Sequence, residues 1–431
     1  MNKPGNSSAS GRVAFTYPGF SWYILARFFI VASLEMQSVA VGWQVYDITK
    51  RPLDLGLVGL AQFLPGIFLF LIAGHAADRF DRRKILLNRY GGFATCSALL
   101  LLLTWKEARS VHLIYLVLIL FGVVRSINWP ASRAILPQLV ADEDLPNAIA
   151  WNSIAFQAAT IIGPALGGVL YAFFRGPSVV YTVSVISAFI AILSFFKIKL
   201  RSVERPHEEI SSKTVFAGLH YIWRKKLVLG SISLDLFAVL LGGAVALLPI
   251  YAREILHAGP WGLGLLRSAP GVGAGMMALL LAYHPLKQRI GVKMLWAVAA
   301  FGVFTIVFGL SHNLMLSLVA LLITGAADMI SVVVRGTLVQ LATPDAMRGR
   351  VNAVDMLFIG ASNEFGEFES GIMAQWLGTV PAVVVGGVGT LIVIVIWAWL
   401  FPELRQAEGF ETIEAERDVI RQAPQELKPK V

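Results

Sequence analysis

Twelve long apolar stretches follow one another closely along this chain of 431 residues, and they restrict what it can fold into. Each reaches about 20 residues, the length that an α-helix needs to cross a bilayer. None shows the period-two alternation of a barrel strand, so helices are expected. The sequence therefore predicts an all-α integral membrane protein with twelve transmembrane helices, at roughly 21–46, 55–76, 85–105, 112–132, 146–174, 178–197, 227–251, 261–283, 292–311, 314–338, 350–377 and 381–401.

The composition agrees with this prediction. Hydrophobic residues make up 56% of the chain and charged residues only 15%, against about a quarter in ordinary soluble domains. Too few charges remain to cover soluble domains of this total length, which disfavours a soluble enzyme and a disordered protein. The first 19 residues lack the apolar core of a cleaved signal peptide, so the first hydrophobic segment is expected to remain as a membrane helix.

The basic residues give the expected orientation. With the N-terminus inside, about 27 of the 36 Lys and Arg residues fall in cytoplasmic segments and about six outside. Three arginines, Arg27, Arg125 and Arg267, fall within helices. Both termini are therefore expected in the cytoplasm, in a bacterial inner membrane. The net charge of +9 is explained by topology, so no nucleic-acid partner is required.

An internal repeat divides the chain. The stretch RAILPQLV (Arg133 to Val140) aligns with RGTLVQLA (Arg335 to Ala342) at an offset of 202 residues. Together with the helix count, this predicts two parallel six-helix pseudo-repeats. The expected division is a cytoplasmic tail at 1–19, a six-helix bundle at 20–197, a linker with an amphipathic helix at 198–226, a second bundle at 227–402 and a cytoplasmic tail at 403–431.

A charged motif lies between the second and third apolar stretches. It reads GHAADRFDRR, from Gly74 to Arg83, and resembles the GxxxDRxGRR signature of the major facilitator superfamily, with Asp81 in place of the usual glycine. The resemblance covers about residues 20–401 and implies twelve helices around a central cavity. It also implies that this motif acts as a conformational latch, formed here by Gly74, Asp78, Arg79, Arg82 and Arg83.

Two further motifs are similar to the same superfamily. Helix 5 carries Gly163, Pro164, Gly167 and Gly168 in a pattern that resembles the family's exporter signature, with Ala159 in place of its first glycine. Small residues permit close helix packing, and proline frees a carbonyl group. In the family the pattern accompanies proton-coupled antiporters. Helix 4 carries Arg125, which matches a family arginine motif only in part, because Asn128 and Trp129 replace its last two residues. Arg125 is a candidate for proton coupling through a nearby carboxylate, and a purely structural ion pair is the alternative.

Acidic residues inside apolar stretches are costly and tend to face a cavity or a partner. Glu35 and Asp328 are the first candidates for proton or substrate binding, because the resemblance places helices 1, 4, 7 and 10 around the cavity. Glu364 and Glu367 share one face of helix 11, and Glu369 points elsewhere. Asp235 either takes part in coupling or pairs with an arginine or a freed backbone group.

Other polar and aromatic side chains are candidates to line the cavity. A buried amide or indole can contact a ligand or serve helix packing alone, and the sequence leaves both open for these residues: Gln37, Trp43, Asn128, Trp129 and Asn363.

No nucleophile–base pair, metal-ligand pattern or phosphate-binding loop is recognisable, so we expect neither enzyme activity nor a cofactor or resident metal.

Three segments, VAVGWQVYDIT, IIGPALGG and FIGASNEFGEFESG, resemble the branch of the superfamily that includes bacterial enterobactin exporters and macrolide efflux proteins. The resemblance implies a monomeric, proton-coupled exporter of a medium-sized organic molecule, such as a siderophore or drug.

The sequence leaves the identity of the substrate open. Buried acids favour a cationic or neutral substrate, whereas arginines paired with these acids could favour an anionic one. Two alternative functions are a lipid or lysolipid flippase on the same fold, and a membrane scaffold without transport activity.

Overall fold

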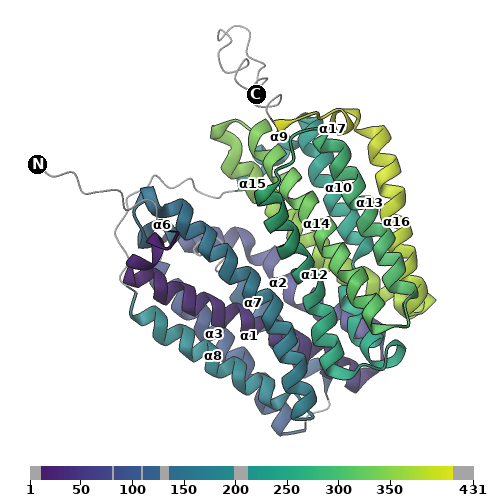
Figure 1. Ribbon diagram of the computed structural model, residues 1–431. Helices are drawn as coiled ribbons and strands as arrows, with labels where there is room; N and C mark the ends of the chain where they lie inside the picture. The colour runs from purple at the N-terminus through teal and green to yellow at the C-terminus, as the bar shows by residue number, and fades with distance from the viewer. Residues whose placement is uncertain (1–10, 80–81, 108–109, 127–134, 199–211, 411–431) are drawn as a thin grey trace, which may run out of the picture. The chain divides into compact units, whose positions relative to one another are not determined.

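The structure is a computed structural model that describes residues 11–79, 82–107, 110–126, 135–198 and 212–410 (Figure 1). Within these ranges the regular elements are helices, and each of the twelve expected stretches overlaps one of them. The all-α prediction is thereby confirmed. Nine segments among the described residues are long and apolar enough to cross a membrane, and the apolar helix α4 (Val111–Ser126) is shorter. The crossing of the membrane by all twelve stays a prediction.

The chain divides into two compact units. Unit 1 comprises Met1–Lys50, Ala61–Glu209 and Gly259–Ser268, and unit 2 comprises Arg51–Leu60, Ile210–Ala258 and Ala269–Val431. The first residues of α2 (Pro52–Arg79) therefore belong to unit 2, and the first residues of α12 (Gly259–Tyr283) belong to unit 1. The expected boundaries between bundles, linker and tails stay predictions.

Unit 1 is built around its first helix. α1 packs most closely on α7 and α8, while α3 packs on α8 and α4. Alanine and glycine dominate the buried side of α7, which lets its backbone approach α1. The helices of unit 1 are α1 (Pro18–Thr49), most of α2, α3 (Arg82–Trp105), α4, α6 (Leu136–Leu139), α7 (Leu145–Phe173) and α8 (Ser178–Phe196), with the short segments η1 (Val13–Thr16) and η2 (Asp142–Asp144).

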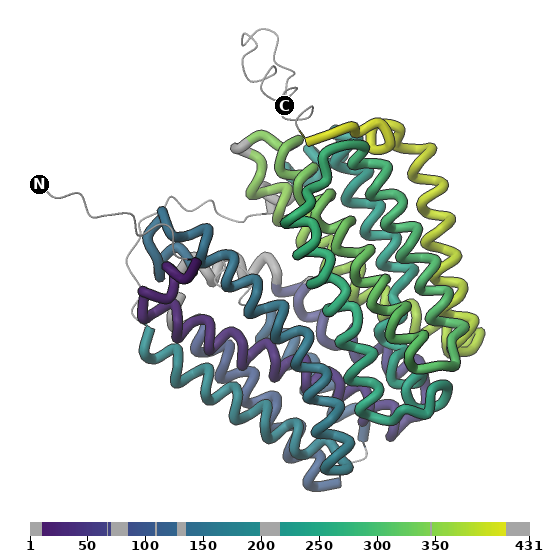
Figure 2. Tube along the Cα trace, viewed as in Figure 1, coloured from purple at the N-terminus to yellow at the C-terminus, as the bar shows by residue number. Residues whose placement is uncertain are grey.

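Unit 2 has α13 at its centre, in contact with α14 and α16, while α10 packs on α15 and α16 (Figures 1 and 2). Its first membrane segment is broken into successive pieces after Gly242. The elements are α9 (Ser212–Arg224), α10 (Lys226–Gly242), η3 (Ala244–Leu247), α11 (Leu248–Ile250), η4 (Tyr251–Ile255), α12, α13 (Ile290–Leu310), α14 (Leu314–Ala342), α15 (Asp345–Leu377), α16 (Thr379–Leu400) and α17 (Pro402–Arg405).

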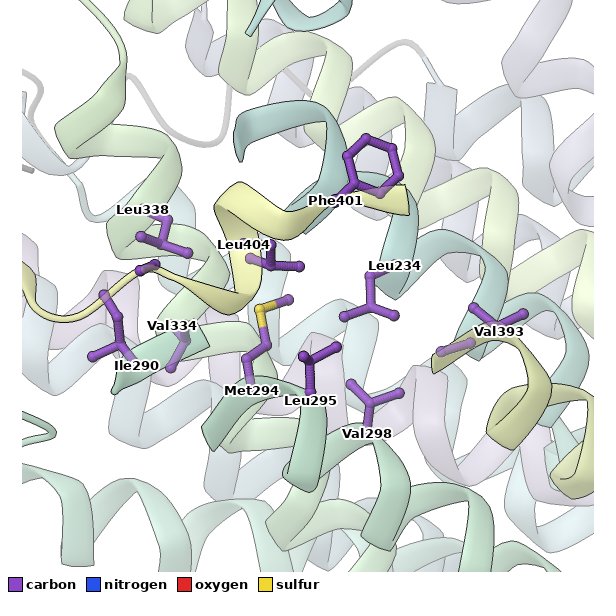
Figure 3. Close-up of a cluster of buried hydrophobic side chains, with 12 residues drawn as sticks. Leu234, Ile290, Met294, Leu295, Val298, Val334, Leu338, Val393, Phe401 and Leu404 are labelled. Atoms are coloured by element: carbon purple, nitrogen blue, oxygen red, sulfur yellow. The ribbon is translucent and has the colours of Figure 1, made fainter. Parts of the chain in front are cut away.

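A buried apolar cluster holds one end of unit 2 together. Side chains from α10, α13, α14 and α16 converge on Phe401 and Leu404, which begin the segment after α16 (Figure 3). Leu404 is fully buried. The turn of α17 thus covers the helix ends with apolar side chains, which anchors the chain before its C-terminal tail.

Both units repeat one packing contact, in agreement with the internal repeat. In unit 1, Gly122 of α4 lies against the backbone of Gln62 and against Pro65 of α2. In unit 2, Gly325 of α14 lies against the backbone of Pro270 of α12. In each unit, a glycine on the fourth membrane helix of that half packs against the second membrane helix, which contains an internal proline.

Candidate functional site

Three helices of unit 2 meet at a buried ion-pair network. The guanidinium group of Arg335 on α14 lies 3.2 Å from Oδ2 of Asp235 on α10 and 2.7 Å from Oδ1 of Asp355 on α15. The side chains are 5%, 7% and 13% exposed, so water screens them little. Asp235 therefore pairs with an arginine, one of the two roles that the sequence left open. Breaking such a network leaves an uncompensated buried charge.

Asp328 lies two helical turns before Arg335 on the same face of α14. It is close enough to both Asp235 and Arg335 to interact with them electrostatically. Three carboxyl groups thus surround one guanidinium group. Asp235 and Asp355 pair with it directly. The third acid is Asp328, for which no hydrogen bond or ion pair is found in the described part of the chain. An acid in such a place is a candidate to take up and release a proton.

Glu364 and Glu367 lie together on α15, as their spacing predicts. Both carboxylates face Gly59 of α2: a Cβ atom built on Gly59 would lie 2.6 Å from Oε2 of Glu367 and 3.2 Å from Oε2 of Glu364. The absence of a side chain at Gly59 leaves room for the two acids. They therefore form a second acidic group within unit 2.

Glu35 is in unit 1, half-buried near the middle of α1. It interacts electrostatically with Arg267 of α12 and Arg125 of α4. Arg267 also donates a hydrogen bond of 3.3 Å to the carbonyl oxygen of Ser38, one turn along α1. The acid is therefore held in a basic surrounding, in contrast to Asp328.

The glycine motif of α7 contacts two helices. Cβ atoms built on Gly163 and Gly167 would lie 2.7 Å from Cβ of Glu35 and 2.8 Å from Cα of Met36, both on α1. A Cβ atom on Gly168 would lie 2.8 Å from Cα of Gly264 on α12, whose own Cβ atom would meet the carbonyl oxygen of Pro164 at 2.6 Å. Any larger residue here requires helix movement.

Two arginines of unit 1 that the sequence analysis did not select lie among aromatic rings. The guanidinium carbon of Arg27 on α1 is 5.4 Å from the ring centre of Phe156 on α7. That of Arg89 on α3 is 5.3 Å from the ring centre of Phe93. α3 begins at Arg82, so Arg89 lies two turns into the helix.

Of the expected cavity-lining residues, the three that the structure describes make local contacts, and their role at a cavity stays a prediction. Gln37 is buried and accepts a 2.5 Å hydrogen bond from the Ser97 hydroxyl on α3. Trp43 packs edge-on against Tyr171 of α7. Asn363 is exposed, and its amide donates to the carbonyl oxygen of Ile359 on the same helix. Asn128 and Trp129 lie outside the described residues.

The latch motif spans the end of α2 and the start of α3. Gly74, Asp78 and Arg79 are helical residues of α2, and Arg82 and Arg83 open α3. Their side chains lie outside the described part of the structure, so the latch role stays a prediction.

The amphipathic helix predicted before the second bundle is present as α9. Its buried face, which includes Tyr221 and Ile222, packs on α10, α14 and α15, and the Tyr221 hydroxyl donates a 2.7 Å hydrogen bond to the carbonyl oxygen of Ala342. Burial raises the pKa of Tyr221 to about 12. Phe216 and Trp223 are 68% and 65% exposed, which suits a helix at a membrane surface.

Asp355 and Arg335 are the members of the unit 2 network that sequence reasoning missed as site residues. Asp355 carries the same signal that selected the other acids, a charge inside an apolar stretch. Arg335 was noted only as part of the repeat. Among the described residues, no group of three or more His, Cys, Asp or Glu side chains could hold a metal ion.

Comparison with known proteins places this arrangement in a family. A family of the major facilitator superfamily, described as "transmembrane secretion effector", matches residues 12–426. The chain belongs to this family. It is therefore a multi-pass membrane transporter of the major facilitator superfamily, as the motifs indicated.

Relatives and solved structures agree with the assignment. The enterobactin exporter EntS of Citrobacter koseri is 28% identical over 396 residues, which cover 91% of this chain and 94% of that protein. A bacterial homologue of the lysosomal transporter Spinster, inward-facing and unoccupied, matches with a TM-score of 0.68 at 14% identity over 92% of this chain and 98% of its own. A D-xylose–proton symporter matches with a TM-score of 0.67 at 13% identity over 89% and 98%. These two structures show the shared fold.

Proposed function

We propose that this transporter is a proton-coupled exporter of a medium-sized organic molecule, such as a siderophore or drug, that works by alternating access. The observation that carries the proposal is Asp328, a buried acid next to an arginine that already binds two carboxylates. Proton binding at Asp328 would change the net charge of this network by one unit. Because the network joins α10, α14 and α15, a change in its charge acts on three helices at once.

A second acid, Glu35 of unit 1, supports the proposal of proton coupling. Glu35 lies on α1 beside the glycine motif of α7, and its charge is balanced against Arg125 and Arg267. Protonation of Glu35 would remove the attraction between this acid and the two arginines. One or both acids are therefore the proposed proton carriers, and Glu364 and Glu367 form the next group.

The relatives direct the choice of substrate to test. The curated relatives are named as enterobactin exporters, so a siderophore is the first molecule to assay and a macrolide the second. In this proposal the protein is a monomer in the inner membrane with both termini in the cytoplasm, and the motif at Asp78 and Arg79 stabilises one closed state.

Purified protein in proteoliposomes with an enclosed pH dye tests the proposal. Addition of enterobactin should move protons across the membrane, and both Asp328→Asn and Glu35→Gln should reduce this movement strongly. The matched control is Asp47→Asn, because Asp47 is half exposed at the far end of α1 and pairs with Lys50 at the surface. Normal proton movement in both acid variants would contradict the assignment of Glu35 and Asp328.

A further inference from the structure

Two arginines in unit 1 each have a buried donor atom without an acceptor. The Nε atoms of Arg27 and Arg89 are buried and have no hydrogen-bond partner. No carboxylate in the described part of the chain lies within ion-pair distance of either guanidinium group; their recorded partners are the rings of Phe156 and Phe93. A buried polar group without a partner is costly, and a charged one in a membrane helix marks a functional site.

The two arginines belong to one positive region. Arg89 interacts electrostatically with Arg27 and with Arg125, and the buried tyrosines Tyr23 and Tyr90 lie beside them. Like charges placed together in a low-dielectric environment repel each other and attract anions. The acid Glu35 interacts with Arg125 and Arg267 instead, so it does not neutralise Arg27 and Arg89.

The stacking geometry leaves the guanidinium edges available. A guanidinium group over an aromatic face is held by a cation–π contact, while its N–H donors point outward in the plane of the group. That planar fork matches two oxygens of a carboxylate, a phosphate or a deprotonated catechol. Both side chains are only partly buried, so a small anion can approach them.

We propose that Arg27 and Arg89 bind an anionic oxygen group of the transported molecule. The inference rests on the proposed export function and narrows its substrate to organic anions. Arg27 is ten residues into α1 and Arg89 eight residues into α3, about 10–14 Å from the helix starts at 1.5 Å per residue. With the helix starts in the cytoplasm, as proposed, the pair lies where a substrate enters from the cell.

A matched pair of ligands tests the anion preference. Salicylate and salicylamide have the same ring and nearly the same shape, and only salicylate carries a carboxylate. In detergent-solubilised full-length protein, salicylate should raise the melting temperature and quench tryptophan fluorescence, and salicylamide should bind at least about tenfold more weakly. Equal binding of the two would overturn the proposal. No proton gradient is present, so this result is independent of proton coupling.

Three variants connect the binding to the residues. Arg27→Gln and Arg89→Gln should each weaken salicylate binding about tenfold or more, and Arg27→Lys should retain part of it. The control is Arg405→Gln, since Arg405 is exposed on α17 of unit 2, and it should bind normally. Wild-type affinity in both glutamine variants would also overturn the proposal.

Stability without ligand separates a binding role from a structural one. Because no acid in the described ranges pairs with Arg27 or Arg89, their glutamine variants should melt at the same or a higher temperature than the wild type. A lowered melting temperature with an unchanged salicylate response would show that the arginines serve packing, and would refute the proposal.

Lipid phosphate is the other source of the same chemistry. If phosphatidylglycerol, compared with phosphatidylcholine, raises the melting temperature through Arg27 while salicylate has no effect, the anion comes from lipid and the transported-anion proposal fails. If salicylate competes with phosphatidylglycerol or acts alone, the proposal stands.

Discussion

Within their helices, unit 1 carries mainly arginines and unit 2 mainly acids. In unit 1, Glu35 interacts electrostatically with Arg125 and Arg267, and Arg89 interacts with Arg27 and Arg125. In unit 2, Asp235, Asp328 and Asp355 surround Arg335. The two units thus share a glycine–proline packing contact but differ in the sign of the charge that predominates within their helices.

Alignment of the two halves shows the difference in charge at individual positions. At the offset of 202 that aligns the halves, the three acids of unit 2 correspond to Ser33, Ser126 and Ser153 of unit 1. Each serine hydroxyl donates to a backbone carbonyl of its own helix. A serine satisfied within its helix makes no demand on neighbouring helices, whereas an aspartate requires a cation or a proton. The two halves therefore share a packing contact but differ in the charge at these three positions.

Removal of Arg335 should have the largest effect. Arg335→Met leaves Asp235 and Asp355 buried without a cation, which costs about 3–5 kcal/mol when one partner of a buried pair is lost. We expect a large drop in melting temperature or in the yield of folded protein, measured by fluorescence-detected size exclusion.

The matched rescue is the neutral triple variant Arg335→Met, Asp235→Asn, Asp355→Asn. It removes the charges together and should recover most of the stability, since neutral replacement of a buried ion network is often tolerated. A single Arg335→Met variant as stable as the wild type would mean that the unit 2 network is not held by charge.

Glycine substitutions test whether the two units share their packing. Gly167→Ala in unit 1 brings a methyl group to the backbone of Met36, and Gly325→Ala in unit 2 brings one to the backbone of Pro270. Each should lower stability by about 1–3 kcal/mol. Thermal denaturation of both variants in the same detergent provides the measurement.

The controls come from the same units. Gly91 on α3 and Gly336 on α14 have open space where a Cβ atom would lie, so alanine at either position should be neutral within about 1 kcal/mol. If Gly91→Ala and Gly167→Ala melt alike, close packing of α7 on α1 is not needed for stability.

The smallest effect is expected where each half begins. In unit 1 the segment before α1 binds α7 through Asn147, which accepts from the backbone amide of Ala14. In unit 2 the helix before α10 is held by the Tyr221 hydroxyl. Tyr221→Phe removes one hydrogen bond and should cost about 1 kcal/mol.

The titration of Tyr221 provides a second readout. Its folded pKa of about 12 is above the unperturbed value near 10. Its stabilising effect is therefore complete below pH 10 and is lost as the pH rises towards 12. Tyrosinate absorbance should show a late-titrating component that is smaller by one tyrosine in Tyr221→Phe; an identical curve for the variant would contradict the buried position.

The sequence predicts the helices well and the ion pairs only in part. Hydropathy is a local property, so it locates the helices, and the charge of Asp235 inside one of them requires a partner. The identity of that partner depends on the packing of α10 against α14 and α15, which brings together residues up to 120 positions apart.

Cys96 has a practical consequence for tests of these ideas. It is the single cysteine of the chain and is completely buried on α3. A water-soluble maleimide should therefore leave the native protein unlabelled, and any engineered cysteine becomes the one reactive thiol. The natural sequence can therefore be used for site-directed labelling without first replacing its own cysteine.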